Sequence, residues 1–142
     1  MKTDTCLFCR IVSGELPATI VYEDDESVAF LDHRPLFPGH TLLVPREHVE
    51  TLGELPKEIV APYFEAAQLL SRAVESAMDA EGTFVAMNNR VSQSVPHLHV
   101  HVVPRRRKDG LKGFFWPRTK YKDDEEMRVV QSKIAAALKK LK

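Results

Sequence analysis

Three histidines alternate with aliphatic residues in the segment 97–103, which reads His-Leu-His-Val-His-Val-Val. Such alternation is typical of a half-buried strand, so Leu98 and Val100 are predicted to share one face with Val102. The other face then carries His97, His99 and His101, each about 6.5–7 Å from the next. Prolines bracket the run at positions 96 and 104, as is common at strand ends. Packing does not explain three imidazoles in a row, and the pattern indicates chemistry.

Cys6 and Cys9 form a second group, a CxxC pair near the start of the chain. Such a pair can be a redox motif, half of a zinc site or a coincidence. A redox motif expects a thioredoxin-like βαβ context, which the sequence does not supply here. A zinc site needs two more ligands to complete a tetrahedron, and His48 and His97 are candidates. His40 follows a Pro-Gly turn at the start of a predicted strand, where a side chain can be aimed into a pocket.

The segments around these residues read as a β meander with two helices. Strands are predicted at 20–23, 27–31, 40–45 and 83–88, and the last should pair antiparallel with the histidine strand through the loop 89–95. An apolar stripe predicts a long helix over 55–79, with Pro62 either near its proper start or at a kink. A C-terminal helix over 123–142 has acidic residues in its first turn, lysines in its last, and an apolar seam.

Length and charge narrow the class of protein. A chain of 142 residues is enough for one domain with a real core, and 44% apolar with 28% charged residues is a globular composition. Twenty basic and twenty acidic residues leave no net charge, so no global field attracts nucleic acid or an anionic membrane. The first ten residues lack a signal-peptide core and no stretch has the length of a membrane span, so we expect a cytoplasmic protein without membrane or nucleic-acid partners.

These motifs together resemble the histidine triad (HIT) superfamily. The resemblance covers most of the chain and includes HxHxHxx with aliphatic x, the CxxC pair, Phe30–Asp32, the segment PGHTLLVP at 38–45 with the following Arg-Glu-His, and Gln-Ser-Val at 93–95. It implies an α+β fold, a mainly antiparallel five-stranded sheet with one long helix and a C-terminal helix. Residues 1–142 would form a single HIT domain, with 1–15 as a zinc-anchored N-terminal segment. The family usually dimerises into one continuous sheet, so a homodimer is expected.

The resemblance also implies an activity, because HIT proteins are hydrolases and transferases acting on the α-phosphate of nucleotide conjugates. His99 would be the nucleophile that forms a nucleotidyl-imidazole intermediate, and His101 would donate to a phosphoryl oxygen. His40, the family's fourth histidine, would buttress the triad of His97, His99 and His101. Asp32 would meet the ribose hydroxyls. The expected phosphate-site residues are Asn88, Asn89, Gln93, Ser94 and Val95.

One branch of the family holds a structural zinc through residues that correspond here to Cys6, Cys9, His48 and His97. A Mg²⁺ ion would accompany a polyphosphate substrate, although no acidic pair marks a site for it. The Phe-Pro-Gly-His turn and the proline after the triad favour dinucleoside polyphosphates, and nucleoside phosphoramidates are the alternative. An adenosine-type nucleotide is the expected substrate. The loop 88–93 departs from the family's glycine-containing pattern, which affects the phosphate contacts.

Two other classes compete with this interpretation. In the first, His97, His99 and His101 chelate one catalytic metal ion of a metal-dependent hydrolase. In the second, the chain is a nucleotide-binding regulatory module with little turnover. Two further segments carry open alternatives. Arg105 to Lys108 is a solvated turn or faces phosphate, and Phe114 to Trp116 is a lid or a dimer contact.

Overall fold

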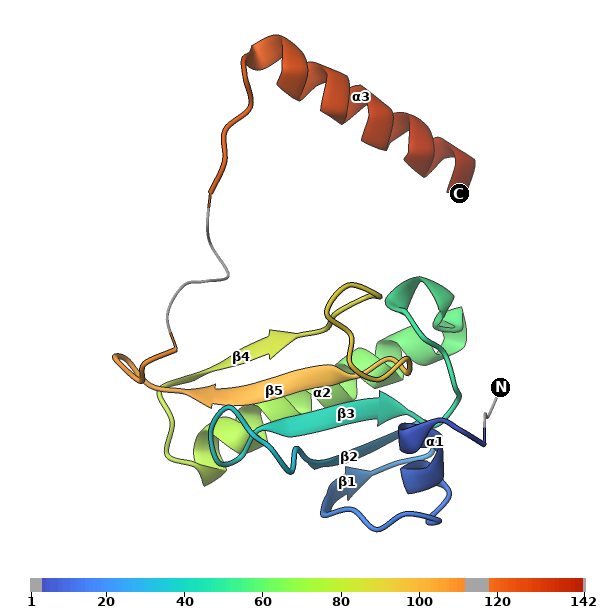
Figure 1. The fold of residues 1–142 in the computed structure, drawn as a ribbon, viewed down its shortest axis with the longest axis vertical. Coiled ribbons are helices and arrows are strands. Elements are labelled where there is room, and N and C mark those ends of the chain that lie inside the picture. Colours follow the sequence, from blue (N-terminus) through green and yellow to red (C-terminus); the bar gives the residue numbers. More distant parts are fainter. Residues whose placement is uncertain (1–3, 112–117, 142) are drawn as a thin grey trace. The chain divides into compact units, whose positions relative to one another are not determined.

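The computed structural model describes residues 4–111 and 118–141, and its internal contacts divide the chain into two units, Met1–Asp109 and Gly110–Lys142. The first unit contains one antiparallel sheet with the strand order β1-β2-β3-β5-β4 (Figure 1). Its strands are β1 (Ile20–Glu23), β2 (Ser27–Leu31), β3 (Thr41–Pro45), β4 (Gly82–Ala86) and β5 (Val100–Arg105). Its helices are α1 (Leu7–Val12), the 3-10 turn η1 (Leu52–Glu54) and α2 (Lys57–Ala77). The predicted α+β class with a five-stranded sheet is confirmed.

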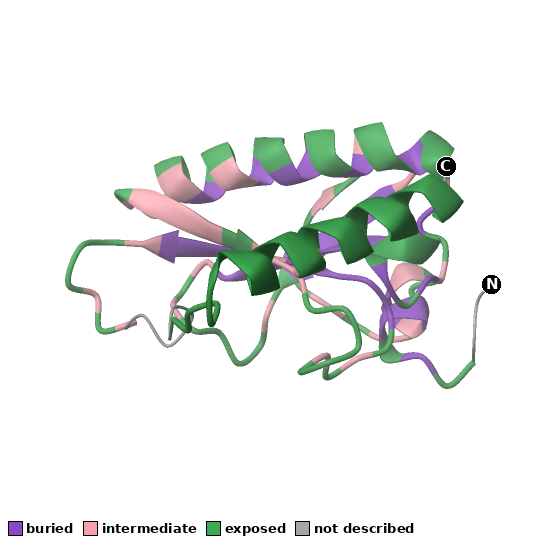
Figure 2. Ribbon diagram, turned by 90° about the horizontal axis from the view of Figure 1, so that it is seen from above, coloured by how far each residue is buried: buried purple, intermediate pink, exposed green. Residues whose placement is uncertain are grey.

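Alternating residues of β2 and β3 supply two separate apolar cores. Ala29 and Leu43 belong to the core under α2, together with Tyr63 and Leu70 of that helix. Their neighbours along the strands pack in the second core beneath α1, together with two residues of that helix: Val28, Phe30, Leu42, Val44, Phe8 and Ile11. Since side chains of a strand alternate between faces, α2 and α1 cover opposite faces of the sheet. Figure 2 shows the buried stripe of α2 and the buried part of α1.

Helix α2 contains Pro62 and yet runs continuously over Lys57–Ala77, four turns beyond the proline. Of the two alternatives for Pro62, a helix that starts near the proline is therefore wrong, since α2 begins at Lys57. Pro62 is the sixth residue of the helix, so its missing N–H removes a single hydrogen bond, from the first turn. Buried Ile59 and fully buried Tyr63 hold the helix on the sheet on both sides of that position, and the Tyr63 hydroxyl donates to the Leu43 carbonyl at 2.8 Å.

The histidine segment is less of a strand than the sequence predicts, because β5 begins at Val100 and ends at Arg105. His97 and His99 lie ahead of the strand, and only His101 lies within it. The β3–β5 register runs from Thr41–Val102 to Leu43–Val100, so the next pairs would set Pro45 opposite Leu98. Pro45 has no N–H to donate, and the Leu98 N–H bonds instead to the Val49 carbonyl at 2.7 Å. The alternation of faces still holds, since Leu98, Val100 and Val102 all enter the core under α2.

The other element boundaries differ little from the predictions. The strands predicted at 20–23 and 27–31 are confirmed, the third begins at Thr41 instead of His40, and β4 ends at Ala86 instead of residue 88. In the second unit, α3 (Asp124–Leu141) corresponds to the helix predicted for 123–142. The single domain predicted for 1–142 stays a prediction. None of the helices in the described ranges is long and apolar enough to cross a membrane.

Candidate active site and metal centre

The three histidines of the triad lie on the face of the sheet that α1 covers. Phe8 of α1 packs edge-on against both His97 and His99, with ring centroids 6.0 and 5.1 Å apart. The His99 and His101 rings are also in contact, with centroids 5.0 Å apart. His97 and His99 are buried, whereas His101 is half-buried. The predicted common face for the three imidazoles is thus what the structure has, even though two of them precede the strand.

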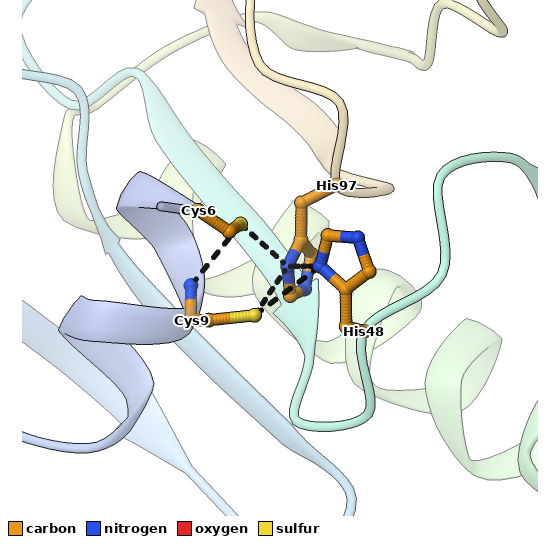
Figure 3. A group of neighbouring side chains, drawn as sticks. All are labelled: Cys6, Cys9, His48 and His97. Atoms are coloured by element: carbon orange, nitrogen blue, oxygen red, sulfur yellow. Dashed lines mark hydrogen bonds between the residues drawn. The ribbon is translucent and has the colours of Figure 1, made fainter. Parts of the chain in front are cut away.

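Cys6, Cys9, His48 and His97 form a compact cluster, with one ligand atom of each within 4.8 Å of the others (Figure 3). The two Nδ1 atoms are 3.2 Å apart, Cys9 Sγ lies 3.2 Å from His48 Nδ1, and Cys6 Sγ lies 3.4 Å from His97 Nδ1. A tetrahedron with zinc–sulfur and zinc–nitrogen bonds of ordinary length has edges of about 3.3 to 3.8 Å. The spacing and the donor set of these four residues therefore fit a closed structural zinc site.

The hydrogen bond of His97 determines which of its nitrogens faces the thiols. His97 Nε2–H donates to the Pro45 carbonyl at 2.8 Å, so Nδ1 carries the lone pair. Burial, followed by the nearby His48 and His99, lowers the pKa of His97 to about 4, and the bond to Pro45 opposes this only partly. The Nδ1 atoms of His97 and His48 and the two sulfurs thus lie against one another, an arrangement that a cation would stabilise.

His99 is oriented by the backbone carbonyl of His97. Its Nδ1–H donates to the His97 carbonyl oxygen at 2.8 Å. The lone pair of His99 is therefore on Nε2, which is the arrangement that a nucleophilic imidazole needs. Burial lowers the pKa of His99, so the ring is neutral and its Nε2 unprotonated at pH 7. His97 consequently serves both groups, the metal centre through its side chain and His99 through its carbonyl.

His40 and His101 form a hydrogen-bonded pair whose tautomers can be worked out from one backbone group. The Leu36 N–H donates to His40 Nδ1 at 3.1 Å, which leaves the proton of the neutral ring on Nε2. That Nε2–H donates to His101 Nδ1 at 2.9 Å. His101 must then carry its own proton on Nε2, as a hydrogen-bond donor. Burial is the main cause that lowers the pKa of both rings, to about 4 for His101, so both are neutral at pH 7.

Asp32 lies beside this pair, with Oδ2 3.8 Å from His40 Nε2. Its other oxygen accepts the Arg34 N–H at 3.0 Å, and its backbone N–H bonds to the His40 carbonyl. Asp32, His40 and His101 also bring ligand atoms within 4.8 Å of one another. Within residues 4–111 and 118–141, the two groups of potential metal ligands are thus this one and the cysteine–histidine cluster, and neither is the all-oxygen set that Mg²⁺ prefers. The expected Mg²⁺ has no support in the structure.

The predicted phosphate-loop residues make hydrogen bonds within the loop and to the segment 50–52. Asn88 donates to the Ser92 carbonyl, and Asn89 accepts the Leu52 N–H at 2.8 Å. Gln93 accepts the Arg90 N–H and donates to the Glu50 carbonyl at 2.6 Å. Arg90 and Ser92 have φ of 72° and 61°, in the left-handed region that favours glycine. Ser94 is exposed, and Val95 packs against the core under α1. These roles in phosphate binding remain predictions.

Chelation of one metal ion by all three triad histidines does not fit this geometry. His97 directs Nδ1 at the cysteines, and His99 uses its Nδ1–H on a carbonyl, so the rings do not converge. Reasoning from the sequence also missed three participants: the Leu36 N–H, the Pro45 carbonyl and Phe8. The two backbone groups leave no signal in side-chain types. Phe8 could have been noted as the aromatic one of the two apolar residues between the cysteines, in the first turn of α1.

The basic run begins with the last residue of β5, Arg105, and continues through residues 106–108 into the turn that follows the strand. Arg105 makes a bidentate ion pair with Asp109, at 2.6 and 3.0 Å, and Arg107 pairs with Glu81 at 2.6 Å. Arg106 donates to the Met78 carbonyl at the end of α2. The solvated-turn interpretation of this basic run is therefore the better one. The predicted aromatic tip at Phe114 to Trp116 lies outside the described residues.

The site combines a buried histidine whose Nε2 is available, a histidine pair beside it and a separate Cys₂His₂ cluster. On the antiparallel sheet of an α+β fold, this combination is a histidine-triad type of site. The model of the family described as HIT domain matches residues 13–108. The chain belongs to this family.

Relatives and solved structures agree with that assignment. "Protein hit" of Bacillus subtilis is 35% identical over 140 residues, 95% of each chain. Adenosine 5'-monophosphoramidase hnt1 of Schizosaccharomyces pombe is 33% identical over 137 residues, covering 95% of this chain and 99% of that protein. Adenylylsulfatase HINT3 of Arabidopsis thaliana is 37% identical over 108 residues, 75% of this chain and 55% of the plant protein.

Among solved structures, a HIT family member from Bacillus subtilis has a TM-score of 0.82 at 34% identity and covers 94% of this chain and 96% of its own. A Zn-bound histidine triad family protein from Mycobacterium smegmatis has a TM-score of 0.71 at 36% identity, with coverage of 97% and 98%. The zinc-bound neighbour supports the same metal for the Cys₂His₂ cluster.

Proposed function

We propose that this protein is a nucleotide hydrolase that attacks the α-phosphorus of AMP conjugates with His99 Nε2. One observation carries the proposal: the His99 Nδ1–H is bound to the His97 carbonyl, which leaves Nε2 unprotonated beside the His101 ring. An imidazole nucleophile needs this tautomer, because only the unprotonated nitrogen can form a bond to phosphorus. Two relatives whose names state an AMP phosphoramidase and an adenylylsulfatase support a hydrolase of this type.

In the first step, the His99 Nε2 lone pair forms a bond to the α-phosphorus, and the bond from phosphorus to the leaving group breaks. The leaving group departs with the electron pair and takes a proton from solvent. The His99 ring becomes cationic, and its Nδ1–H bond to the His97 carbonyl strengthens accordingly. The His101 Nε2–H donates to a nonbridging oxygen as charge develops on it.

In the second step, a water oxygen bonds to phosphorus and the phosphorus–nitrogen bond to His99 breaks. The product is AMP, with one proton released, and His99 returns to its neutral form. His40 keeps His101 in the donor tautomer throughout both steps. We assign Asp32 to the ribose hydroxyls, because a carboxylate beside the His40–His101 pair can accept two hydrogen bonds. We also assign the binding of the phosphate groups to five residues of the loop before the triad: Asn88, Asn89, Gln93, Ser94 and Val95.

Cys6, Cys9, His48 and His97 would hold zinc, which supplies a structural cross-link and no step of the reaction. We also propose a cytoplasmic location, since Cys6 and Cys9 form no disulfide with each other and structural disulfides are rare there. A homodimer with a continuous sheet is the further expectation. It would use an edge strand, and β4 is one of the two edges, with Val85 exposed.

The leaving group of the substrate distinguishes the two candidate activities. Dinucleoside polyphosphates and AMP phosphoramidates share the adenylyl part that His99 would receive, and they differ only in what departs. The phosphoramidase relative favours a nitrogen leaving group, whereas the Phe37-Pro38-Gly39 turn resembles that of polyphosphate hydrolases. The experiment should therefore present diadenosine tetraphosphate and an AMP phosphoramidate side by side.

The test is the intact mass of the protein after brief incubation with each substrate, combined with a turnover assay. Wild type should gain the mass of one AMP moiety, and His99→Gly should not. His33→Gly is the matched control, because it removes an exposed imidazole outside both histidine clusters and should behave as wild type. Turnover by His99→Gly at the wild-type rate would refute the mechanism. A folded wild type without adduct or turnover on either substrate would indicate a nucleotide-binding module instead.

A further inference from the structure

Phe8 lies between the two cysteines of the metal centre and packs against the histidine that we propose as the nucleophile. It belongs to the first turn of α1, directly before Cys9, and its side chain is buried. Its ring is nearly perpendicular to that of His99, at 85°, and the centroids are 5.1 Å apart, so the two rings are in edge-to-face contact. Since the transfer of AMP to His99 uses no group of Phe8, this contact indicates another role.

The backbone bond of His99 does not fix the direction of its ring by itself. The Nδ1–H donates to the His97 carbonyl at 2.8 Å, but the terminal torsion of a histidine is broad and a hydrogen bond tolerates tens of degrees of misalignment. Contacts on the ring must therefore fix the direction of the Nε2 lone pair. His101 gives one such contact, with centroids 5.0 Å apart, and Phe8 gives a second.

Phe8 is itself held from two sides. Its ring packs against Phe30 of β2, with centroids 5.3 Å apart, in the core beneath α1. Cys6 and Cys9, on either side of it, belong to the cluster in Figure 3, where both side chains are directed at imidazoles. A helix of six residues is not stable alone, so α1 has the position that these contacts give it. The ring of Phe8 is therefore a fixed support.

We propose that Phe8 is a positioning residue, which holds the plane of the His99 imidazole so that Nε2 is directed at the α-phosphorus. The role in catalysis rests on the proposed function, whereas the orientation of His99 rests on the ring contacts alone. Phe8 touches no reacting atom in this role. It should therefore affect the rate of AMP transfer and not the affinity for the nucleotide.

The first test follows the imidazole protons of the full-length, nitrogen-15-labelled protein by NMR and needs no substrate. Two of these protons lie in bonds of equal length, His99 Nδ1–H to the His97 carbonyl and His97 Nε2–H to the Pro45 carbonyl, both 2.8 Å. In Phe8→Leu, the His99 proton should exchange with water about three- to tenfold faster, the factor that one aromatic contact corresponds to. The His97 proton should keep its wild-type exchange rate, because the bond to Pro45 is independent of Phe8.

Val28→Ala is the matched control for this test. It removes buried apolar atoms from the same core, on β2, which β3 separates from the histidine strand. Both protons should exchange in this variant as they do in wild type. Equal changes of the two protons in Phe8→Leu, or none, would overturn the proposal, because Phe8 would then support the whole site or neither ring. If Phe8→Leu does not fold by circular dichroism, Phe8→Ile takes its place.

The second test measures the single-turnover rate of AMP transfer from an AMP phosphoramidate, and the affinity for AMP by calorimetry. Phe8→Leu should lower the rate about three- to tenfold relative to Val28→Ala and leave the Kd for AMP unchanged. A rate equal to that of the control, or a Kd that rises by the same factor, would overturn the proposal. A wild type that transfers no AMP would refute the proposed function instead, and the NMR result would still decide whether Phe8 holds the His99 ring.

Discussion

The hydrogen bond from His40 to His101 allows a sharp prediction about the tautomers in the site. The Leu36 N–H occupies His40 Nδ1, so His40 can offer only a donor to His101 Nδ1, at 2.9 Å. In His40→Leu, the His101 Nδ1 loses this donor in a site where residue 40 is only 3% exposed. The His101 proton can then move to Nδ1, and the donor toward a phosphoryl oxygen is lost for that fraction of molecules.

The expected size of the effect follows from the burial of this pair. Leaving a buried acceptor unsatisfied costs about 1–3 kcal/mol. Where that cost falls on the transition state, kcat/KM decreases by about 5- to 150-fold. His40→Gln is the informative partner variant, because its side-chain amide can still donate to His101. We therefore expect it to keep most of the activity that His40→Leu loses.

Two measurements check this prediction. Nitrogen-15 NMR of the imidazoles reports directly which nitrogen of His101 carries the proton, and it needs no knowledge of the substrate. The kinetics of AMP phosphoramidate hydrolysis report the consequence. If His101 keeps its proton on Nε2 in His40→Leu, or if His40→Gln is as inactive as His40→Leu, the assignment of tautomers from the Leu36 N–H is wrong.

Three further predictions concern the metal centre, the pH dependence of stability and the turn before His40. Purified protein should contain about one zinc per chain by elemental analysis, and Cys9→Ser should lose it together with a large part of its thermal stability, whereas Ser13→Ala should not. Burial, together with the nearby His99 and His40, lowers the pKa of His101 from 6.5 to about 4, and Asp32 opposes this shift only partly. As the pH falls from about 6.5 to about 4, this histidine is therefore protonated in the unfolded state but still neutral in the folded state. The free energy of unfolding should fall over that range by at most about 3 kcal/mol from this residue, and urea titrations at pH 7.5 and 5 should show a smaller loss in His101→Asn. Gly39→Ala should destabilise the fold by about 1–3 kcal/mol, because φ is 98° and the new Cβ would lie 2.6 Å from Met78 Cγ. Unchanged urea midpoints in Gly39→Ala would contradict that account.

Side-chain patterns predicted most of the fold. The alternation around His99 identified the correct faces, and the strands at 20–23 and 27–31 have the predicted bounds. The errors come from tertiary contacts that override local signals. Pro45, across the sheet, ends the ladder before His99, and the buried side chains of Ile59 and Tyr63 keep a helix that Pro62 alone would interrupt.

The candidate site was predictable where side chains provide the chemistry. Cys6, Cys9, His48 and His97 do come together, and His40 does meet His101. What the sequence could not provide are the backbone groups that select tautomers, because every residue has the same carbonyl and nearly every one the same N–H. Their roles depend on three-dimensional position alone.

The cluster of cysteines and histidines also joins distant parts of the chain. Cys6 and His97 are 91 residues apart, so a metal held by both closes a loop that contains almost the entire sheet unit. Closing so long a loop restricts the unfolded ensemble strongly, with a loop-closure entropy worth about 4–5 kcal/mol on the scale used for disulfides. During synthesis, moreover, the cysteines leave the ribosome long before their histidine partner. His99, which we propose as the nucleophile, lies two residues beyond that partner, so it is oriented only after nearly all of the sheet unit has been made.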